Sequence, residues 1–350
     1  MHRLLLLLIF STISFAQDFL PKIKYNPKKY IAYKIEQPII IDGKLNDSQW
    51  DNAEWTDNFV DIEGSLKPDP FFNTKVKMLW DSSYFYFGAQ IEEPHVWATL
   101  TQRDAVIFKD NDFEIFLDPD GDTHNYYELE INALGTEWDL LLLKPYHDGS
   151  KVAIDSWDIA GLKSKVFIDG TINDPSDTDI GWSVEIAIPW QVLEEAAPNF
   201  HPEIGEQWKV NFSRVHWNRD IINGEYIKTK DPEYNWVWSP QGHIYMHIPE
   251  LWGLVQFEGK KDDLKTIVFK ENNNDKIKWA LRQIYYQQRN YNEKNGSYSK
   301  SIEELNLSNS PVENVPWPPK IHLTYSGWEA SLVWNNKTYY IRKDGLVWIQ

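Results

Sequence analysis

Two segments near the middle of the chain alternate apolar and polar residues with a period of two, which is typical of β-strands with one buried face. The segments are residues 112–118 and 126–132. Their apolar positions, which would face a core, are Phe113, Ile115, Leu117, Tyr127, Leu129 and Ile131. Their other positions are rich in acid and include Asp112, Glu114, Asp118, Glu128, Glu130 and Asn132. The sequence therefore predicts two strands with a strongly acidic outer face.

An acidic face of this kind needs compensation, because like charges on adjacent strands repel one another. The residues alone leave three explanations open. A metal ion could bind the carboxylates, two carboxyl groups could share a proton for catalysis, or a ligand rich in hydroxyl groups could donate hydrogen bonds to them.

Further short strands are predicted on both sides of the acidic pair, with turn-rich connections between them. They lie within residues 39–41, 74–93, 136–146, 164–170, 181–193, 205–217 and 252–259. Many short strands and little helix favour a mainly β fold, an antiparallel β-sandwich over residues 38–259. Residues 17–37 are basic and interrupted by proline, and we expect them to be a loosely packed leader.

The pattern changes after Gly259. Residues 275–291 place apolar side chains at helical spacing, and Ser301 with Glu304 suggests a capping box for one further turn. Four runs joined by the turn-type dipeptides Ser-Gly, Asn-Asn and Asp-Gly then predict a small β-meander. Residues 260–350 are thus expected to form a separate α+β module, a helix packed on a short meander, which could bind a protein partner.

The first 16 residues have the features of a secretory signal peptide, with a basic start, a short apolar run and small residues before Ala16. We therefore expect a secreted or periplasmic protein cut near Ala16. The sequence contains no cysteine, which excludes disulfides and a lipid anchor on a cysteine, and no apolar run is long enough to span a membrane. A formal net charge of −17 argues against nucleic acid or an anionic membrane as a partner.

The chain contains 18 tryptophans, and a surface rich in indole rings is suited to stacking on sugars. Several segments, taken in order, carry a resemblance to a known family: IDGKLNDSQW, KVKMLWDSSYFYFGAQIEEP, DNDFEIFLDP, YYELEIN, GWSVEIAIPW and WKVNFSR. Residues 38–258 resemble the carbohydrate-binding modules of family 9. The resemblance implies a β-sandwich that holds a saccharide, a chain end in the family, between two aromatic rings.

Carried over by position, the resemblance implies that Phe108 and Trp238 are the two rings and that Glu114 and Asn132 bind sugar hydroxyls. Glu130 stands where the family has an arginine, so a hydrogen-bond acceptor replaces a donor and the recognised sugar is in doubt. Further side chains are predicted to line the rim of the site, and Arg103 and Arg214 could instead neutralise the carboxylates. The rim candidates are Trp97, Trp138, Trp217, Trp236, Arg103, Arg214 and His216.

Two alternatives use the same acids differently. Glu114 with Glu128 or Glu130 could serve as the carboxylate pair of a glycoside hydrolase, although nothing in the sequence shows that they flank a scissile bond. Asp118, Asp120 and Asp122 resemble the start of a calcium loop, but Leu129 stands where an EF-hand requires glutamate. We therefore predict a saccharide-binding protein without a catalytic residue, and no cofactor other than a structural calcium ion, which the family resemblance also implies.

Overall fold

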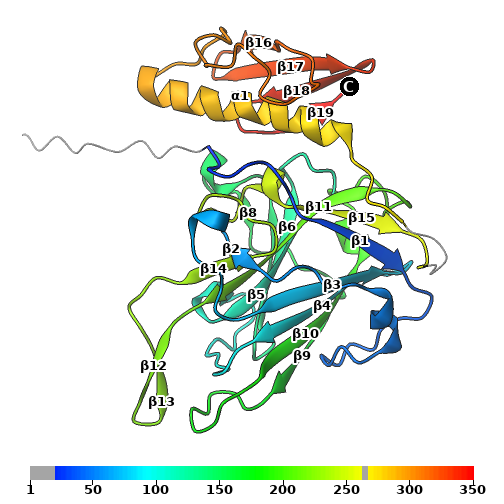
Figure 1. Ribbon diagram of the computed structural model, residues 1–350, viewed down its shortest axis with the longest axis vertical. Helices are drawn as coiled ribbons and strands as arrows, with labels where there is room; N and C mark the ends of the chain where they lie inside the picture. The colour runs from blue at the N-terminus through cyan, green and yellow to red at the C-terminus, as the bar shows by residue number, and fades with distance from the viewer. Residues whose placement is uncertain (1–19, 262–266) are drawn as a thin grey trace, which may run out of the picture.

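A computed structural model describes residues 20–261 and 267–350 of the protein. The predicted signal peptide, residues 1–16, lies outside the described residues. The described part is mainly β: a large curled sheet with a projecting hairpin, and a C-terminal helix on a small sheet (Figure 1). None of the helices in the described part combines the length and the apolar character that a membrane span requires.

The large sheet contains 13 strands, and its main path has the order β8-β7-β6-β5-β11-β15-β1-β3-β4-β10-β9. Strand β14 pairs with β11 and β2, off this path. The strands are β1 (Lys29–Lys34), β2 (Val60–Asp61), β3 (Thr74–Trp80), β4 (Tyr84–Glu92), β5 (Asp112–Asp118), β6 (Tyr126–Asn132), β7 (Glu137–Leu142), β8 (Ala153–Ile154), β9 (Lys163–Asp169), β10 (Gly181–Pro189), β11 (Gln207–His216), β14 (Tyr234–Val237) and β15 (Gly253–Glu258).

Short 3-10 helices interrupt the connections between these strands, and η3 (Ile107–Lys109) leads directly into β5. The others are η1 (Ser48–Asn52), η2 (Gly64–Leu66), η4 (Tyr146–Asp148), η5 (Trp190–Leu193) and η6 (Pro249–Leu251). Strands β12 (Arg219–Ile222) and β13 (Glu225–Lys228) form a separate two-stranded hairpin that projects from the end of the sandwich opposite the C-terminal module (Figure 1).

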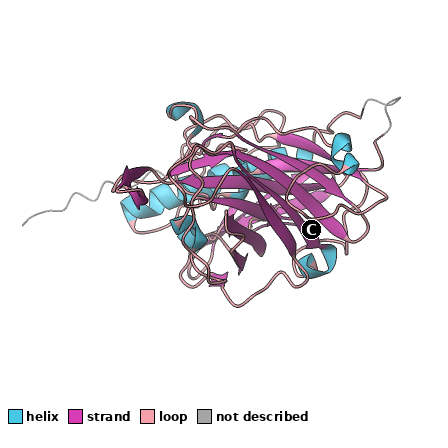
Figure 2. Cartoon of the chain, turned by 90° about the horizontal axis from the view of Figure 1, so that it is seen from below, coloured by secondary structure: helices cyan, strands magenta, loops and turns pink. Residues whose placement is uncertain are grey.

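The large sheet curls so that its two halves face each other across one core. Alternate residues of β5, β6 and β11 point into this core, where they meet alternate residues of β3, β4 and β10. Figure 2 shows the strands as layers that form most of the body. The predicted β-sandwich is confirmed, and the alternation of β5 and β6 fixes which of their faces is buried in it.

The N-terminal segment is more ordered than the sequence indicated. Strand β1 pairs in parallel with β15 and with β3, in the middle of the large sheet. Residues 29–34 therefore belong to the sandwich, and the prediction of a loosely packed leader over residues 17–37 is wrong for them. The pattern of this segment is basic, and the parallel ladder forms only because its neighbours come from distant parts of the chain.

The C-terminal module has the predicted helix and meander. Helix α1 (Asn273–Asn295) begins at Asn272, whose side chain accepts the backbone N–H of Asn274, and ends at Gly296, which adopts a left-handed conformation. Its apolar side packs on the small sheet. The strands of that sheet are β16 (Lys320–Leu323), β17 (Trp328–Trp334), β18 (Lys337–Arg342) and β19 (Val347–Ile349), paired in that order.

Polar contacts attach α1 to the sandwich. The Lys278 ammonium donates to the carbonyls of Asp120 and Gly121, at 2.8 and 2.9 Å. The buried Arg282 guanidinium donates to the Thr123 hydroxyl and lies 3.5 Å from the Glu250 carboxylate. Figure 1 shows α1 between the small sheet and the sandwich. The helix therefore has two partners, with its apolar residues on the small sheet and charged ones on the sandwich.

Candidate functional site

Four carboxylates from adjacent strands form the acid cluster, defined as Asp112, Glu114, Glu128 and Glu130. Strands β5 and β6 are antiparallel, and their register places Glu114 directly opposite Glu130. Ser213 of β11 is the partner of Glu114 on its other side. The side chains share the face of the sheet that points away from the core, as the alternation predicts. At least one carboxylate oxygen each of Asp112, Glu114 and Glu130 lies within 4.8 Å of the others.

The acid cluster is buried although it lies outside the core. All four side chains are at most 5% exposed. Burial is the largest cause that raises each pKa, to about 7 for Glu114 and well above the ordinary range for the other three. Charge repulsion within the cluster raises the pKa values of Asp112, Glu128 and Glu130 further. The cluster is therefore a site where negative charge is strongly disfavoured until a positive partner or protons compensate for it.

Few hydrogen-bond donors reach these carboxylates. The backbone N–H of Val215 donates to Asp112 Oδ1 at 3.0 Å, and that of Phe108 donates to Glu130 Oε2 at 2.9 Å. Among the residues that the structure describes, no lysine or arginine forms an ion pair with the four carboxylates. Within residues 20–261 and 267–350, the charge of the cluster is therefore not compensated by an ion pair.

Aromatic side chains border the acid cluster at the surface. Trp138 is the register partner of Glu130 on β7, so its indole lies on the acidic face. The ring of Phe108, which is 38% exposed, lies 6.4 Å from the Trp138 ring between centroids, at an interplanar angle of 34°. Tyr146 is 45% exposed, and its pKa is raised by partial burial of the hydroxyl and then by the charges of Glu128, Asp155 and Glu130. These three rings, Phe108, Trp138 and Tyr146, are called the aromatic rim below.

Trp217 borders the same region, but its indole already interacts with Phe108 and Lys228. Its indole N–H donates to the Phe108 carbonyl at 2.8 Å. The Lys228 ammonium of the projecting hairpin lies 3.1 Å from the centroid of its ring. One face of Trp217 is therefore covered by a cation, and this residue holds Phe108 in place.

Trp238 is not a surface platform, and the expectation that it clamps a ligand is wrong. Its side chain is 1% exposed and packs in the core beside Tyr30 and Phe212. Gly253 makes room for it, because a Cβ atom at position 253 would lie 2.3 Å from a Trp238 ring atom. Trp236 of β14 is also buried, at 1%. Both indoles belong to the core of the sandwich.

Asn132 lies on the acidic face but has a structural role. Its amide nitrogen donates to the Leu100 carbonyl and to Asp110, and its oxygen accepts the backbone N–H groups of Leu134 and Thr136. The side chain is fully buried. These bonds fix the turn after β6, so the amide has no free group for the sugar contact that the resemblance implied.

The two predicted arginines lie away from the acid cluster. Arg214 is on the core face of β11, where its guanidinium lies 3.7 Å from the Glu93 carboxylate and donates to Thr74. Arg103 forms ion pairs with Glu137 and Asp139, both at 2.6 Å. Residues 137 and 139 alternate with Trp138, so this pairing is on the opposite face of β7. Neither arginine lines the predicted rim or neutralises the cluster by an ion pair. Trp97 is 7% exposed and His216 is 5% exposed, so these two candidates are buried as well.

The aspartates after β5 are close together, as the calcium-loop prediction requires. Oxygens of Asp118, Asp120 and Asp122 lie within 4.8 Å of one another. However, both oxygens of Asp118 accept backbone N–H groups, from Gly121 and Thr123 at 3.0 Å. Asp120 and Asp122 likewise accept the N–H groups two residues ahead. The carboxylates already stabilise the turn, so no orphaned oxygen indicates a missing ion, and calcium in this loop stays a prediction.

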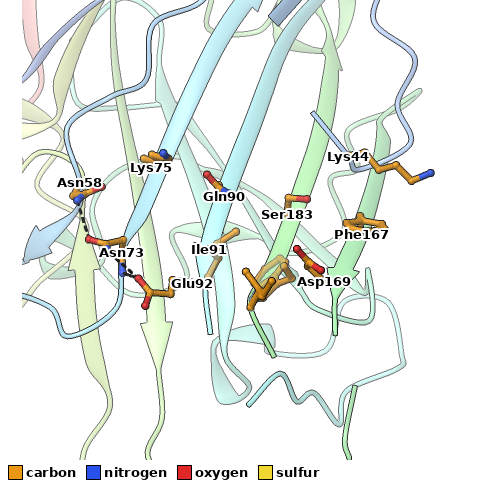
Figure 3. Close-up of a pocket in the computed structure, with 13 residues that line it drawn as sticks. Lys44, Asn58, Asn73, Lys75, Gln90, Ile91, Glu92, Phe167, Asp169 and Ser183 are labelled. Atoms are coloured by element: carbon orange, nitrogen blue, oxygen red, sulfur yellow. Dashed lines mark hydrogen bonds between the residues drawn. The ribbon is translucent and has the colours of Figure 1, made fainter. Parts of the chain in front are cut away.

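A hollow on the outer face of the opposite half of the sheet is separate from the acid cluster. It has a volume of about 450 Å³ and lies over β3, β4, β10 and β9 (Figure 3). Lys75, Gln90, Ser183 and Phe167 follow one another across these four strands in register. Asn73 bonds to Asn58 and Glu92 at its edge. This lining is polar with one exposed ring, and no part of the sequence pattern singled it out.

Two further hollows lie elsewhere. One, of about 580 Å³, is between the sandwich and α1 and includes Asp148 and Asp344. The other, of about 180 Å³, lies beside Trp217 and is lined by Phe71 and Arg219 among others. Tyr146 of the aromatic rim was also missed by sequence reasoning, because it stands in a connection after β7 where no periodicity marks a face.

The acid cluster does not have the layout of a hydrolase pair. Such a pair flanks a glycosidic bond, with its carboxyl groups at least about 5 Å apart and the substrate between them. Here Asp112, Glu114 and Glu130 are at most 5% exposed, whereas a sugar held between two carboxyl groups would need both of them at the surface. The geometry is better suited to holding one small positive charge than to admitting a sugar between two carboxylates.

Comparison with known proteins identifies a family. The family described as "Carbohydrate family 9 binding domain-like" matches residues 41–233, which is more than half of the chain. No curated protein matches the chain.

Solved structures with a similar chain trace include a family 9 carbohydrate-binding module from Caldicellulosiruptor kristjanssonii, in complexes with cellotriose and with glucose. Both have a TM-score of 0.42 and 17% identity; they cover 69% and 68% of this chain, and 99% and 100% of theirs. A putative carbohydrate-binding protein from Bacteroides uniformis has a TM-score of 0.49 and 18% identity, and covers 67% of this chain and all of its own.

Proposed function

The chain belongs to the carbohydrate family 9 binding domain-like family, and we propose that it binds a saccharide non-covalently at the aromatic rim. The observation that carries this proposal is the pair of surface rings, Phe108 and Trp138, beside the buried Glu130. A pyranose ring stacks its C–H face on such rings while its hydroxyl groups bond to polar atoms beside them. The ligand in this proposal is a chain end, following the family resemblance, and the protein acts in polysaccharide capture or degradation outside the cytoplasm.

Binding without turnover fits the family, whose members are described as binding domains. A hydrolase on the same face is the alternative, but the burial of the carboxylates disfavours it. The C-terminal module contributes no residue to the aromatic rim. It attaches to the loop after β5 through Lys278 and Arg282, and in this proposal it supports the sandwich and leaves its outer surface for a protein partner.

Titration of the mature protein with a panel of oligosaccharides tests the proposal. Phe108→Ala and Trp138→Ala each remove one ring, and we expect the affinity to fall about tenfold, or about 1.4 kcal/mol. Phe167→Ala is the matched control, since it removes an exposed ring from the separate hollow of Figure 3. Loss of binding in Phe167→Ala with full binding in the other two variants would move the site to that hollow. Oligosaccharides with blocked ends test the chain-end preference.

A further inference from the structure

The acid cluster gathers four carboxylates on adjacent strands, and in the described part of the chain no lysine or arginine forms an ion pair with them. Asp112 is fully buried, and Glu114, Glu128 and Glu130 are 5%, 4% and 2% exposed. Water therefore does little to screen their mutual repulsion. Arg214 and Arg103, the two arginines that could have neutralised the carboxylates, are paired elsewhere, with Glu93 and with Glu137 and Asp139.

Two oxygens of the acid cluster have no partner. Asp112 Oδ2 and Glu128 Oε2 are buried and accept no hydrogen bond from the described residues. A buried carboxylate oxygen without a donor is costly, and native structures rarely leave one so. The aspartates of the loop after β5 provide the contrast, since backbone N–H groups reach all three of them. The unpartnered oxygens mark the acid cluster, not the loop, as the place suited to bind a cation.

We propose that Asp112, Glu114 and Glu130 together bind one divalent cation of the calcium type, with Glu128 and the Ser213 hydroxyl beside it. Calcium takes six to eight oxygen ligands at about 2.3–2.6 Å, so two oxygens on one ion lie at most about 5 Å apart. The three carboxylates meet this limit, with oxygens within 4.8 Å of one another. Magnesium, with shorter bonds and a strict octahedron, would require a tighter arrangement.

A cation at this position would explain how the two strands tolerate facing acids. Glu114 and Glu130 are cross-strand neighbours, and an ion between them turns a repulsive pair into a bridge. The Phe108 N–H bonds to Glu130, so the ion would also steady the backbone of η3 and with it the aromatic rim. This inference goes beyond saccharide binding. It concerns the protein without a sugar, so it stands or falls independently of the proposed function.

Thermal unfolding of the full mature chain after chelation, with and without added calcium, is the first measurement. We expect calcium to raise the melting temperature by several degrees, with magnesium less effective at the same concentration. Equilibrium dialysis should find one ion per chain at the acid cluster. Glu130→Gln removes one ligand with little change of shape, and we expect it to weaken the calcium effect at least tenfold in concentration.

The sign of the Glu130→Gln effect without calcium separates a ligand from a merely structural residue. In chelator this variant should match or exceed the wild type in melting temperature, because it removes one repelling charge; in calcium it should melt below the wild type. Asp112→Asn serves as the second variant if Glu130→Gln fails to fold. Asp120→Asn is the matched control in the loop after β5 and should keep the calcium effect. A wild type indifferent to calcium, or a calcium effect lost in Asp120→Asn and retained in Glu130→Gln, would overturn the proposal.

Discussion

Glu114 of β5 and Glu130 of β6 are direct cross-strand partners, so the antiparallel ladder holds two buried carboxylates face to face. Like charges in this position destabilise a sheet. Because Phe108 bonds to Glu130 through its backbone, the same pair also supports the exposed ring that we place at the saccharide site. Whatever neutralises the charge of Glu114 and Glu130 should therefore affect both the stability of the sheet and the position of the Phe108 ring.

Replacing Glu114 tests binding against catalysis. In Glu114→Gln we expect the saccharide affinity to change less than about tenfold, because the two stacking rings, Phe108 and Trp138, are retained, and we expect no glycosidic turnover in either protein. Affinity is measured by calorimetry, and turnover by release of reducing ends from the bound oligosaccharide. Turnover by the wild type that disappears in the variant would instead establish the hydrolase alternative.

Replacing Trp238 tests its placement in the core. Trp238→Ala should lower the free energy of unfolding by about 3–5 kcal/mol, because it deletes a large buried side chain. Phe108→Ala, at a residue that is 38% exposed, should cost much less. Urea unfolding measures both. Gly253→Ala should also be strongly destabilising, since its Cβ would overlap the Trp238 ring. A stable Trp238→Ala protein that no longer binds saccharide would return Trp238 to the ligand site.

His216 makes the protein sensitive to acid. Burial, then the charges of Arg214 and Arg219, lower its pKa to about 2, from about 6.5 in the unfolded chain. Its ring is stacked on Trp236 and bonded to Asn111, with Phe71 and Tyr234 at its edge. Between the two pKa values, the imidazole of the unfolded chain binds a proton and that of the native state does not. Its contribution is complete above pH 6.5 and falls as the pH drops towards 2, by about 1.4 kcal/mol per pH unit.

His216→Gln should therefore flatten the pH dependence of stability. Urea unfolding at pH 7, 6 and 5 should show the wild type losing about 0.7 kcal/mol more than the variant between pH 7 and 6, and about 1.2 kcal/mol more between pH 6 and 5, whatever their difference at pH 7. His322→Gln, at an exposed position of β16, is the control and should leave the slope unchanged. Parallel curves for the wild type and His216→Gln would show that His216 accepts a proton in the native state.

Arg282 should be essential for the attachment of the C-terminal module. It is 2% exposed, lies 3.5 Å from Glu250, and bonds to Thr123 of the sandwich. Arg282→Met leaves Glu250 with the Tyr286 hydroxyl as its remaining partner from α1 and should cost about 3–5 kcal/mol. Lys276→Met, on the exposed side of α1, should cost under about 0.5 kcal/mol. Thermal unfolding distinguishes them, and equal melting temperatures would contradict a structural role for Arg282.

Period-two alternation was sufficient to predict β5, β6 and the meander, because each strand has one face in a core and one outside it. The same alternation also indicates the face on which Arg214 lies. Arg214 has the same parity as Trp208, Val210 and Phe212 along β11, so the pattern already placed it on the core face. Trp238 was harder to predict, because its segment is too short for alternation to fix a direction. The family resemblance implied a sugar-stacking ring at this position and therefore placed Trp238 at the surface, whereas its side chain lies in the core.

Local sequence thus determined which segments become strands, where α1 begins and ends, and that one face of β5 and β6 carries acid, since these depend on residue periodicity and end-capping groups close in the chain. Tertiary structure alone decided that β1 enters the large sheet between β15 and β3, that Glu114 meets Glu130, and that Asn132 and Trp238 are enclosed. These outcomes depend on pairing and burial between residues far apart in the sequence. A local pattern cannot predict these pairings or this burial, because the curl of the sheet determines which side chains outside the core remain exposed.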